Sequence, residues 1–192
     1  MASSSLMTPD DCFSLLGLPR SAALAEADLQ RAYLERSRDA HPDQAGGDEA
    51  RAAALNAARD VLASPARRLR HFIELEFPDA AARWSVVPMD EGMMALFSRV
   101  GAAVQRAAAL AKELEGAKSA LARALLTDRV MREREALEQT GEDVDALSHA
   151  LVADLPGKED HRDAHALQHA QARLAYLEKW RAQICEALMK LV

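Results

Sequence analysis

Residues with high helix propensity make up more than half of this 192-residue chain, and this pattern limits its fold more than any other feature. Alanine, leucine, arginine and glutamate dominate the sequence, and all four have high helix propensity. β-Branched residues are sparse, so an extensive sheet is not expected. Hydrophobic residues make up 49% of the chain, which is enough for a real core. The sequence therefore predicts an all-α protein of one domain or two small ones.

Four helices are predicted in the N-terminal part of the chain. A short first helix ends at Gly17, which suits a left-handed cap. The second helix covers about residues 21–40 and must end there, because the residue before Pro42 is pushed out of the helical region. Asp48 is the predicted cap of the third helix, and the fourth covers about residues 66–75. The buried face of the third helix is expected to carry Leu55, Ala58 and Leu62.

The loop between the second and third helices contains His41, Pro42 and Asp43. The proline stiffens the loop, and the two polar residues beside it project from a fixed bend. A tip of this kind loses little entropy when it binds a partner. The tripeptide alone is a weak signal, and a polar turn without a function is the plain alternative.

With the helices on either side, this loop resembles the J domain of the DnaJ superfamily. The resemblance runs from about residue 10 to residue 75, and it includes the segment 55–62 (LNAARDVL). It implies an antiparallel helical hairpin whose HPD loop and second helix bind a DnaK-type ATPase chaperone. The chaperone carries out the ATP hydrolysis that the J domain stimulates, so this chain is not expected to be an enzyme.

Basic residues on the second helix are the other expected chaperone contacts, and these are Arg31, Arg36 and Arg38. Glu35 and Asp39 dilute the positive charge of this helix, and Gln44 follows the HPD motif at a position where many J domains carry lysine or arginine. A solvated helix face is the alternative, with pairs at i,i+4 such as Arg31 with Glu35.

The C-terminal half is predicted to be an antiparallel helical bundle, because helical segments are joined by short turns. One helix carries a heptad seam made of Met93, Phe97, Val100, Val104, Ala107, Ala111 and Leu114. A second helix is lined by Leu121, Leu125, Val130 and Leu137. A separate extra helix is expected over residues 144–155, and a long last helix carries apolar positions from Leu167 to Leu191. The predicted organisation is a J domain over 1–77, a junction over 78–90 and a bundle over 91–192.

The layout of the whole chain resembles HscB, the J-type co-chaperone family of iron–sulfur cluster assembly. The segments 12–19 (CFSLLGLP) and 173–181 (RLAYLEKWR) carry this resemblance, and the Gly/Phe-rich linker and CxxCxGxG repeats of general DnaJ proteins are absent from the sequence. The resemblance implies an HscA-like chaperone partner and an IscU-type iron–sulfur scaffold as the client. A J-domain protein for a different client is one alternative, and a structural helical protein with a vestigial HPD loop is another.

The client is expected to bind an apolar patch at the start of the bundle, formed by Met93, Met94 and Phe97. Methionines make an adaptable binding surface. The acidic neighbours that the family places beside this patch are missing from the sequence. The alternative is that Met93 and Phe97 are core positions and only Met94 is exposed.

Other classes of function are disfavoured. A net charge of −6 argues against nucleic acid or an anionic membrane as a partner. Cys12 and Cys185 belong to no CxxC pair, and no cofactor is predicted. His161, His165 and His169 are spaced to share one helix face, but a solvated face is favoured over a metal site. With no signal peptide or membrane segment predicted, the cytoplasm is the expected location.

Overall fold

The computed structural model describes residues 11–40 and 49–191 of the chain. Within these ranges the chain forms helices and no strands, so the predicted all-α fold class is confirmed. The helices are α1 (Cys12–Leu16), α2 (Glu26–Ala40), α3 (Glu49–Ala63), α4 (Pro65–Glu76), α5 (Pro78–Ala81), α6 (Glu91–Gly116), α7 (Ala120–Ala153), α8 (Leu155–Asp160) and α9 (Ala164–Met189).

The chain divides into two compact units. The N-terminal unit comprises Met1–Ser85 and Val152–Gln171, and the bundle unit comprises Val86–Leu151 and Ala172–Val192. Residues 152–171 were expected in the C-terminal bundle, but they pack with the N-terminal unit instead. The reason lies in hydrogen bonds that Glu159 and Gln168 make to backbone groups of that unit.

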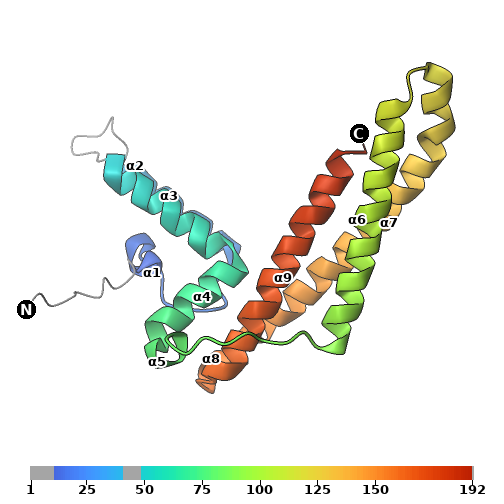
Figure 1. Ribbon diagram of the computed structural model, residues 1–192. Coiled ribbons are helices and arrows are strands. Elements are labelled where there is room, and N and C mark those ends of the chain that lie inside the picture. The colour runs from blue at the N-terminus through green and yellow to red at the C-terminus, as the bar shows by residue number, and fades with distance from the viewer. Residues whose placement is uncertain (1–10, 41–48, 192) are drawn as a thin grey trace, which may run out of the picture. The chain divides into compact units, whose positions relative to one another are not determined.

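In the N-terminal unit, α1 packs against α2 and α3, and α2 packs against α3 (Figure 1). Asp11 caps α1, because its side chain accepts from the backbone N–H groups of Phe13 and Ser14. Gly17 ends this helix in the left-handed conformation, with φ of 70°, as the sequence predicts. Apolar side chains from α1, α2, α3 and α4 form the core. They are Phe13, Leu16, Leu29, Leu55, Ala58, Leu62, Leu69, Phe72 and Ile73.

The bundle unit consists of α6, most of α7 and the second part of α9, which run alongside one another (Figure 1). Their buried side chains form one cluster around Leu137, Val144, Leu177, Trp180 and Ile184. On α6 the buried positions are Met93, Leu96, Val100, Ala103, Ala107, Leu110 and Ala111. The predicted seam is therefore wrong at Phe97 and displaced at Val104, because Leu96 and Ala103 take the inward positions.

Helix α7 is continuous over 34 residues, so the separate extra helix predicted over 144–155 does not form. Gly141 lies inside this helix and is buried. A Cβ there would lie 3.3 Å from Arg181 Nη1 and 3.6 Å from Ile184 Cγ2, so glycine lets α9 approach closely. Leu121 and Leu125, predicted to line the helix, are exposed near its start.

No helix in the described part of the chain is both long enough and apolar enough to cross a membrane.

Candidate functional site

Helices α2 and α3 are joined by specific side-chain contacts. The Tyr33 hydroxyl donates to Asn56 Oδ1 at 2.6 Å, and the Arg59 guanidinium lies over the Tyr33 ring at 5.2 Å from its centroid. Leu29 of α2 is buried as well. These contacts fix the pair of helices from which the loop between them extends. His41, Pro42 and Asp43 themselves lie outside the described residues, as does Gln44.

The three arginines predicted to bind the chaperone are all exposed, but they do not share one face. Arg31 and Arg38 are seven residues apart, close to two helical turns, so they lie on the same side of α2. Arg31 pairs with Asp28 at 3.0 Å, in place of the Glu35 pairing considered from the sequence. Arg36 lies about two-fifths of a turn away from that side, and it lies against Gly17, where a Cβ would collide with Arg36 Nη2. The structure thus places Arg36 beside the end of α1.

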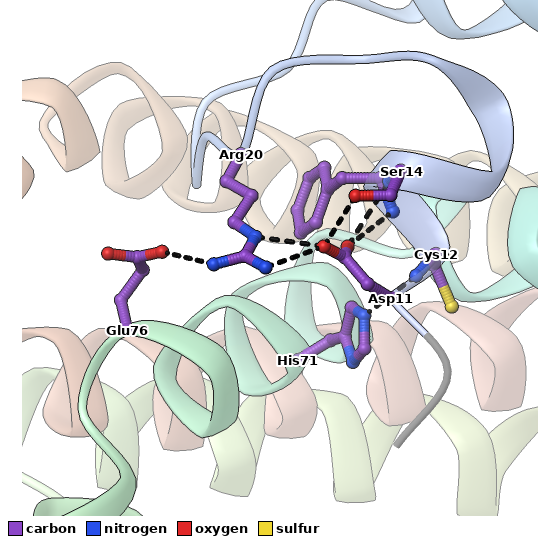
Figure 2. A network of polar contacts seen from close by, with 7 residues as sticks. Asp11, Cys12, Ser14, Arg20, His71 and Glu76 are labelled. Atoms are coloured by element: carbon purple, nitrogen blue, oxygen red, sulfur yellow. Dashed lines mark hydrogen bonds and ion pairs between the residues drawn. The ribbon is translucent and has the colours of Figure 1, made fainter. Parts of the chain in front are cut away.

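A polar network holds the start of α1 against the rest of the N-terminal unit (Figure 2). Arg20 joins two carboxylates, with Nε 2.9 Å from Asp11 Oδ2 and Nη1 2.9 Å from Glu76 Oε1. Partial burial raises the pKa of Asp11, but hydrogen bonds from Ser14 and Arg20 outweigh it, so the pKa lies below its ordinary value. Asp11 therefore acts both as the cap of α1 and as an anchor for Arg20.

His71 is a buried residue of α4 to which the sequence assigned no role. Its Nε2 accepts a hydrogen bond from the backbone N–H of Cys12 at 3.1 Å, and its ring stacks on Phe13 with centroids 5.7 Å apart. Burial lowers the pKa of His71; the charges of Asp11 and Glu74 oppose this effect, and that of Arg20 adds to it. The imidazole is thus held neutral, with the proton on Nδ1. The signal in the sequence was a lone histidine on the apolar face of an amphipathic helix.

The predicted client patch separates into buried and exposed residues. Met93 is only 1% exposed and belongs to the bundle core, so its assignment as a client contact is wrong. Met94 and Phe97 are 57% and 52% exposed, and at i,i+3 they share a face of α6. The centroid of the Phe97 ring lies 5.8 Å from that of Trp180 on α9, and Phe97 packs against this buried tryptophan. We refer to Met94 and Phe97 as the α6 apolar patch.

Two arginines of the bundle unit pair with carboxylates of α7. Arg99 lies two residues after Phe97, and its Nη1 is 2.8 Å from Asp143 Oδ2 on α7. Arg181 on α9 binds both oxygens of Asp145, each at 3.0 Å. The charges of these two arginines are therefore neutralised within the unit.

The three histidines considered as a metal site do not lie on one helix face. His161 falls in the turn before α9, whereas His165 and His169 lie within α9 with ring centroids 4.3 Å apart. Among the residues that the structure describes, no three histidine, cysteine or acidic side chains are grouped to hold a metal ion.

A J domain joined to a helical bundle is the fold that these two units define. Among solved structures, the chain is similar to the chaperone HscB from Vibrio cholerae, with a TM-score of 0.55 and 20% sequence identity. That likeness covers 95% of this chain and 99% of the other. It is also similar to the human co-chaperone protein HscB, with a TM-score of 0.56 and 17% identity over 93% of this chain and 84% of that one. No protein-family model and no curated protein matches the sequence.

Proposed function

We propose that this protein is a J-type co-chaperone that stimulates the ATPase of a DnaK-type, HscA-like chaperone. The observation that carries the proposal is the HscB-like fold over 95% of the chain. In that fold, α2 and α3 stand on either side of the His41-Pro42-Asp43 segment. Hydrolysis then takes place in the chaperone, and this chain contributes binding and positioning without catalysis of its own.

Helix α2 supplies the electrostatic part of the proposed contact. Arg31 and Arg38 share one exposed face, and Arg38 lies in the last turn, next to the loop. Arg36 lies against Gly17 at the end of α1, on another side of α2. We therefore assign Arg31, Arg38, His41, Pro42 and Asp43 to chaperone binding, with Arg36 in a supporting position.

We further propose that the α6 apolar patch binds the client, and that the client is an IscU-type iron–sulfur scaffold. Exposed Met94 and Phe97 support this proposal, since large apolar side chains on a surface commonly mark binding sites. Trp180 beneath Phe97 makes the patch rigid, so little entropy is lost on binding. The identity of the client rests on the resemblance to the HscB family.

The deciding experiment is single-turnover ATP hydrolysis by the host's DnaK-type chaperones. Wild-type protein should accelerate hydrolysis, and His41→Gln should not, because the tip loses the imidazole. The exposed histidine His149 on α7 provides the control, since His149→Gln should behave as wild type. Equal rates with wild type, His41→Gln and chaperone alone would show that the protein is not a J-type co-chaperone.

A further inference from the structure

The peptide groups of Ala22 are held by two charged side chains of opposite sign. Ala22 is fully buried and lies just before α2. Its N–H donates to Glu159 Oε2 at 3.0 Å, and its carbonyl accepts from Arg68 Nε at 2.9 Å. The chain is therefore fixed at this residue from two directions.

Glu159 also binds the neighbouring residue. The Ser21 hydroxyl donates to the same Oε2 at 3.3 Å, and Ser21 Oγ accepts from Ala23 N at 3.2 Å. Hydrogen bonds to a carboxylate are roughly twice as strong as those between neutral groups. We call Glu159 together with Ser21, Ala22 and Arg68 the Ala22 clamp.

One side of the clamp comes from a distant part of the chain. Glu159 lies in α8, 137 residues after Ala22. Its segment makes further contacts within the N-terminal unit: the Arg162 guanidinium lies over the Phe77 ring at 4.8 Å, and Gln168 Nε2 donates to the Ala80 carbonyl at 2.9 Å. Residues 152–171 are thus an integral part of this unit, and Glu159 is held in place to receive Ala22.

The clamp lies where it can set the direction of α2. This helix begins at Glu26, only four residues after Ala22. Farther along, it is held by burial of Leu29 and by the Tyr33–Asn56 hydrogen bond. With its entry fixed as well, α2 cannot pivot about Leu29, and its exposed face keeps one orientation relative to α3.

We propose that Glu159 is a positioning residue for α2, and that it sets how tightly the α2 surface binds the DnaK-type chaperone. This inference rests on the proposed co-chaperone function. It adds a residue from α8, outside the predicted J-domain range of 1–77, to the determinants of chaperone binding. The chemistry is a charge-assisted hydrogen bond that the buried backbone N–H of Ala22 donates to the Glu159 carboxylate.

The first test is amide hydrogen exchange measured residue by residue on the full-length chain. In Glu159→Ala the Ala22 N–H loses its acceptor, and its exchange should become at least about tenfold faster, as expected for a buried donor left unsatisfied. Glu159→Gln keeps an acceptor oxygen and should give an intermediate rate. Asp160→Ala, which removes the adjacent exposed carboxylate on α8, should leave Ala22 unchanged. Equal exchange at Ala22 in Glu159→Ala and Asp160→Ala would overturn the clamp.

The second test is the concentration of each variant that half-maximally stimulates chaperone ATPase. Glu159→Ala should raise this concentration about threefold or more while the maximal stimulated rate stays within twofold of wild type, because the HPD segment is intact. Glu159→Gln should restore most of the affinity. Faster exchange at Ala22 with an unchanged half-maximal concentration would refute the positioning role. Failure of the proposed function appears differently, as no stimulation by wild type, and the exchange data still decide whether the clamp exists.

Discussion

His71 on α4 accepts the backbone N–H of Cys12, 59 residues earlier in the chain, and so ties α4 to the first turn of α1. A neutral imidazole is required, because a protonated ring would present a second N–H to the Cys12 N–H. The stacked Phe13 ring and the Asp11–Arg20–Glu76 network close the same site. One of the contacts that attach α1 to the unit therefore depends on the protonation state of a buried side chain.

This dependence predicts that the protein loses stability in mild acid. Burial lowers the pKa of His71 in the folded state below its ordinary value of 6.5. The unfolded chain therefore binds this proton at a higher pH than the folded chain does. The stability that neutral His71 gives the folded state is fully present above about pH 6.5. It is lost as the pH falls below that value towards the lowered pKa. Urea unfolding between pH 7.5 and 5.5 should show this decrease.

The matched variants are His71→Gln and His149→Gln. His149 is exposed on α7, so replacing it should leave the pH profile as in wild type. His71→Gln should flatten the profile below pH 6.5. Asp11 should cause a separate decrease in stability at a lower pH. Its pKa in the folded state lies below the ordinary carboxyl value of 3.8, so its contribution to stability is lost as the pH falls below 3.8. A wild-type slope in His71→Gln would exclude the imidazole as the source.

Arg31 and Arg38 should act together on chaperone binding, because they share one face of α2. Each alanine substitution should raise the half-maximal stimulating concentration by about 2- to 5-fold, in the range of exposed charge pairs. The effect should shrink in high salt, which screens exposed charges. Arg134→Ala on α7 removes the same charge from the bundle unit and should have no effect. Equal effects of all three substitutions would point to net charge rather than to a defined contact.

Alanine substitutions at Met93 and Phe97 should affect different properties of the protein, the first its stability and the second its binding of the client. Met93→Ala removes a fully buried side chain and should lower the free energy of unfolding by about 2–5 kcal/mol. Phe97→Ala should cost about 1 kcal/mol, since half of its side chain is exposed. It should nevertheless weaken scaffold binding about tenfold or more in calorimetric titration.

Leu121→Ala is the control for that experiment, because Leu121 is an exposed leucine elsewhere in the bundle unit, at the start of α7. It should leave both stability and scaffold affinity near wild type. If Leu121→Ala weakened binding as much as Phe97→Ala, the α6 apolar patch would not be the specific docking site.

Two glycines inside helices should respond in opposite directions to larger side chains. Gly101→Ala should stabilise the protein by about 1 kcal/mol, because a Cβ there meets nothing within 4 Å and alanine favours the helix. Gly141→Leu should destabilise it by about 1–3 kcal/mol, because its side chain would press on Arg181 and Ile184. Urea unfolding of both variants measures these changes. A neutral Gly141→Leu would mean that α7 and α9 do not pack closely at this point.

The sequence predicted most of the N-terminal helices because they carry local signals, but it placed the start of the second helix at about residue 21, whereas α2 begins at Glu26. Gly17 stops α1 where a left-handed cap is needed, and Leu55, Ala58 and Leu62 repeat at helical spacing on the buried face of α3. Such patterns depend only on residues close together in the chain. The all-α fold class could be predicted for the same reason, because helix propensity is a local property of the residues.

The wrong predictions concern packing between distant segments. On α6, both Leu96 and Phe97 are apolar and each fits a heptad, so only the approach of α7 and α9 decides which turns inward. The separate helix expected over residues 144–155 is instead part of the continuous α7, in which Gly141 permits close contact with Arg181. The Ala22–Glu159 bond joins residues far apart in sequence, and no local pattern marks it. The predicted HPD segment lies outside the described residues, so its role stays a prediction.

The membership of residues 152–171 in the N-terminal unit has a consequence for synthesis of the protein. Domains commonly fold from the N-terminus as the ribosome releases them. Here the acceptor for the Ala22 N–H is made only after α6 and α7 have been translated. The N-terminal unit, whose synthesis begins first, is thus completed late, because a nascent chain lacks part of it until residues 152–171 have been added.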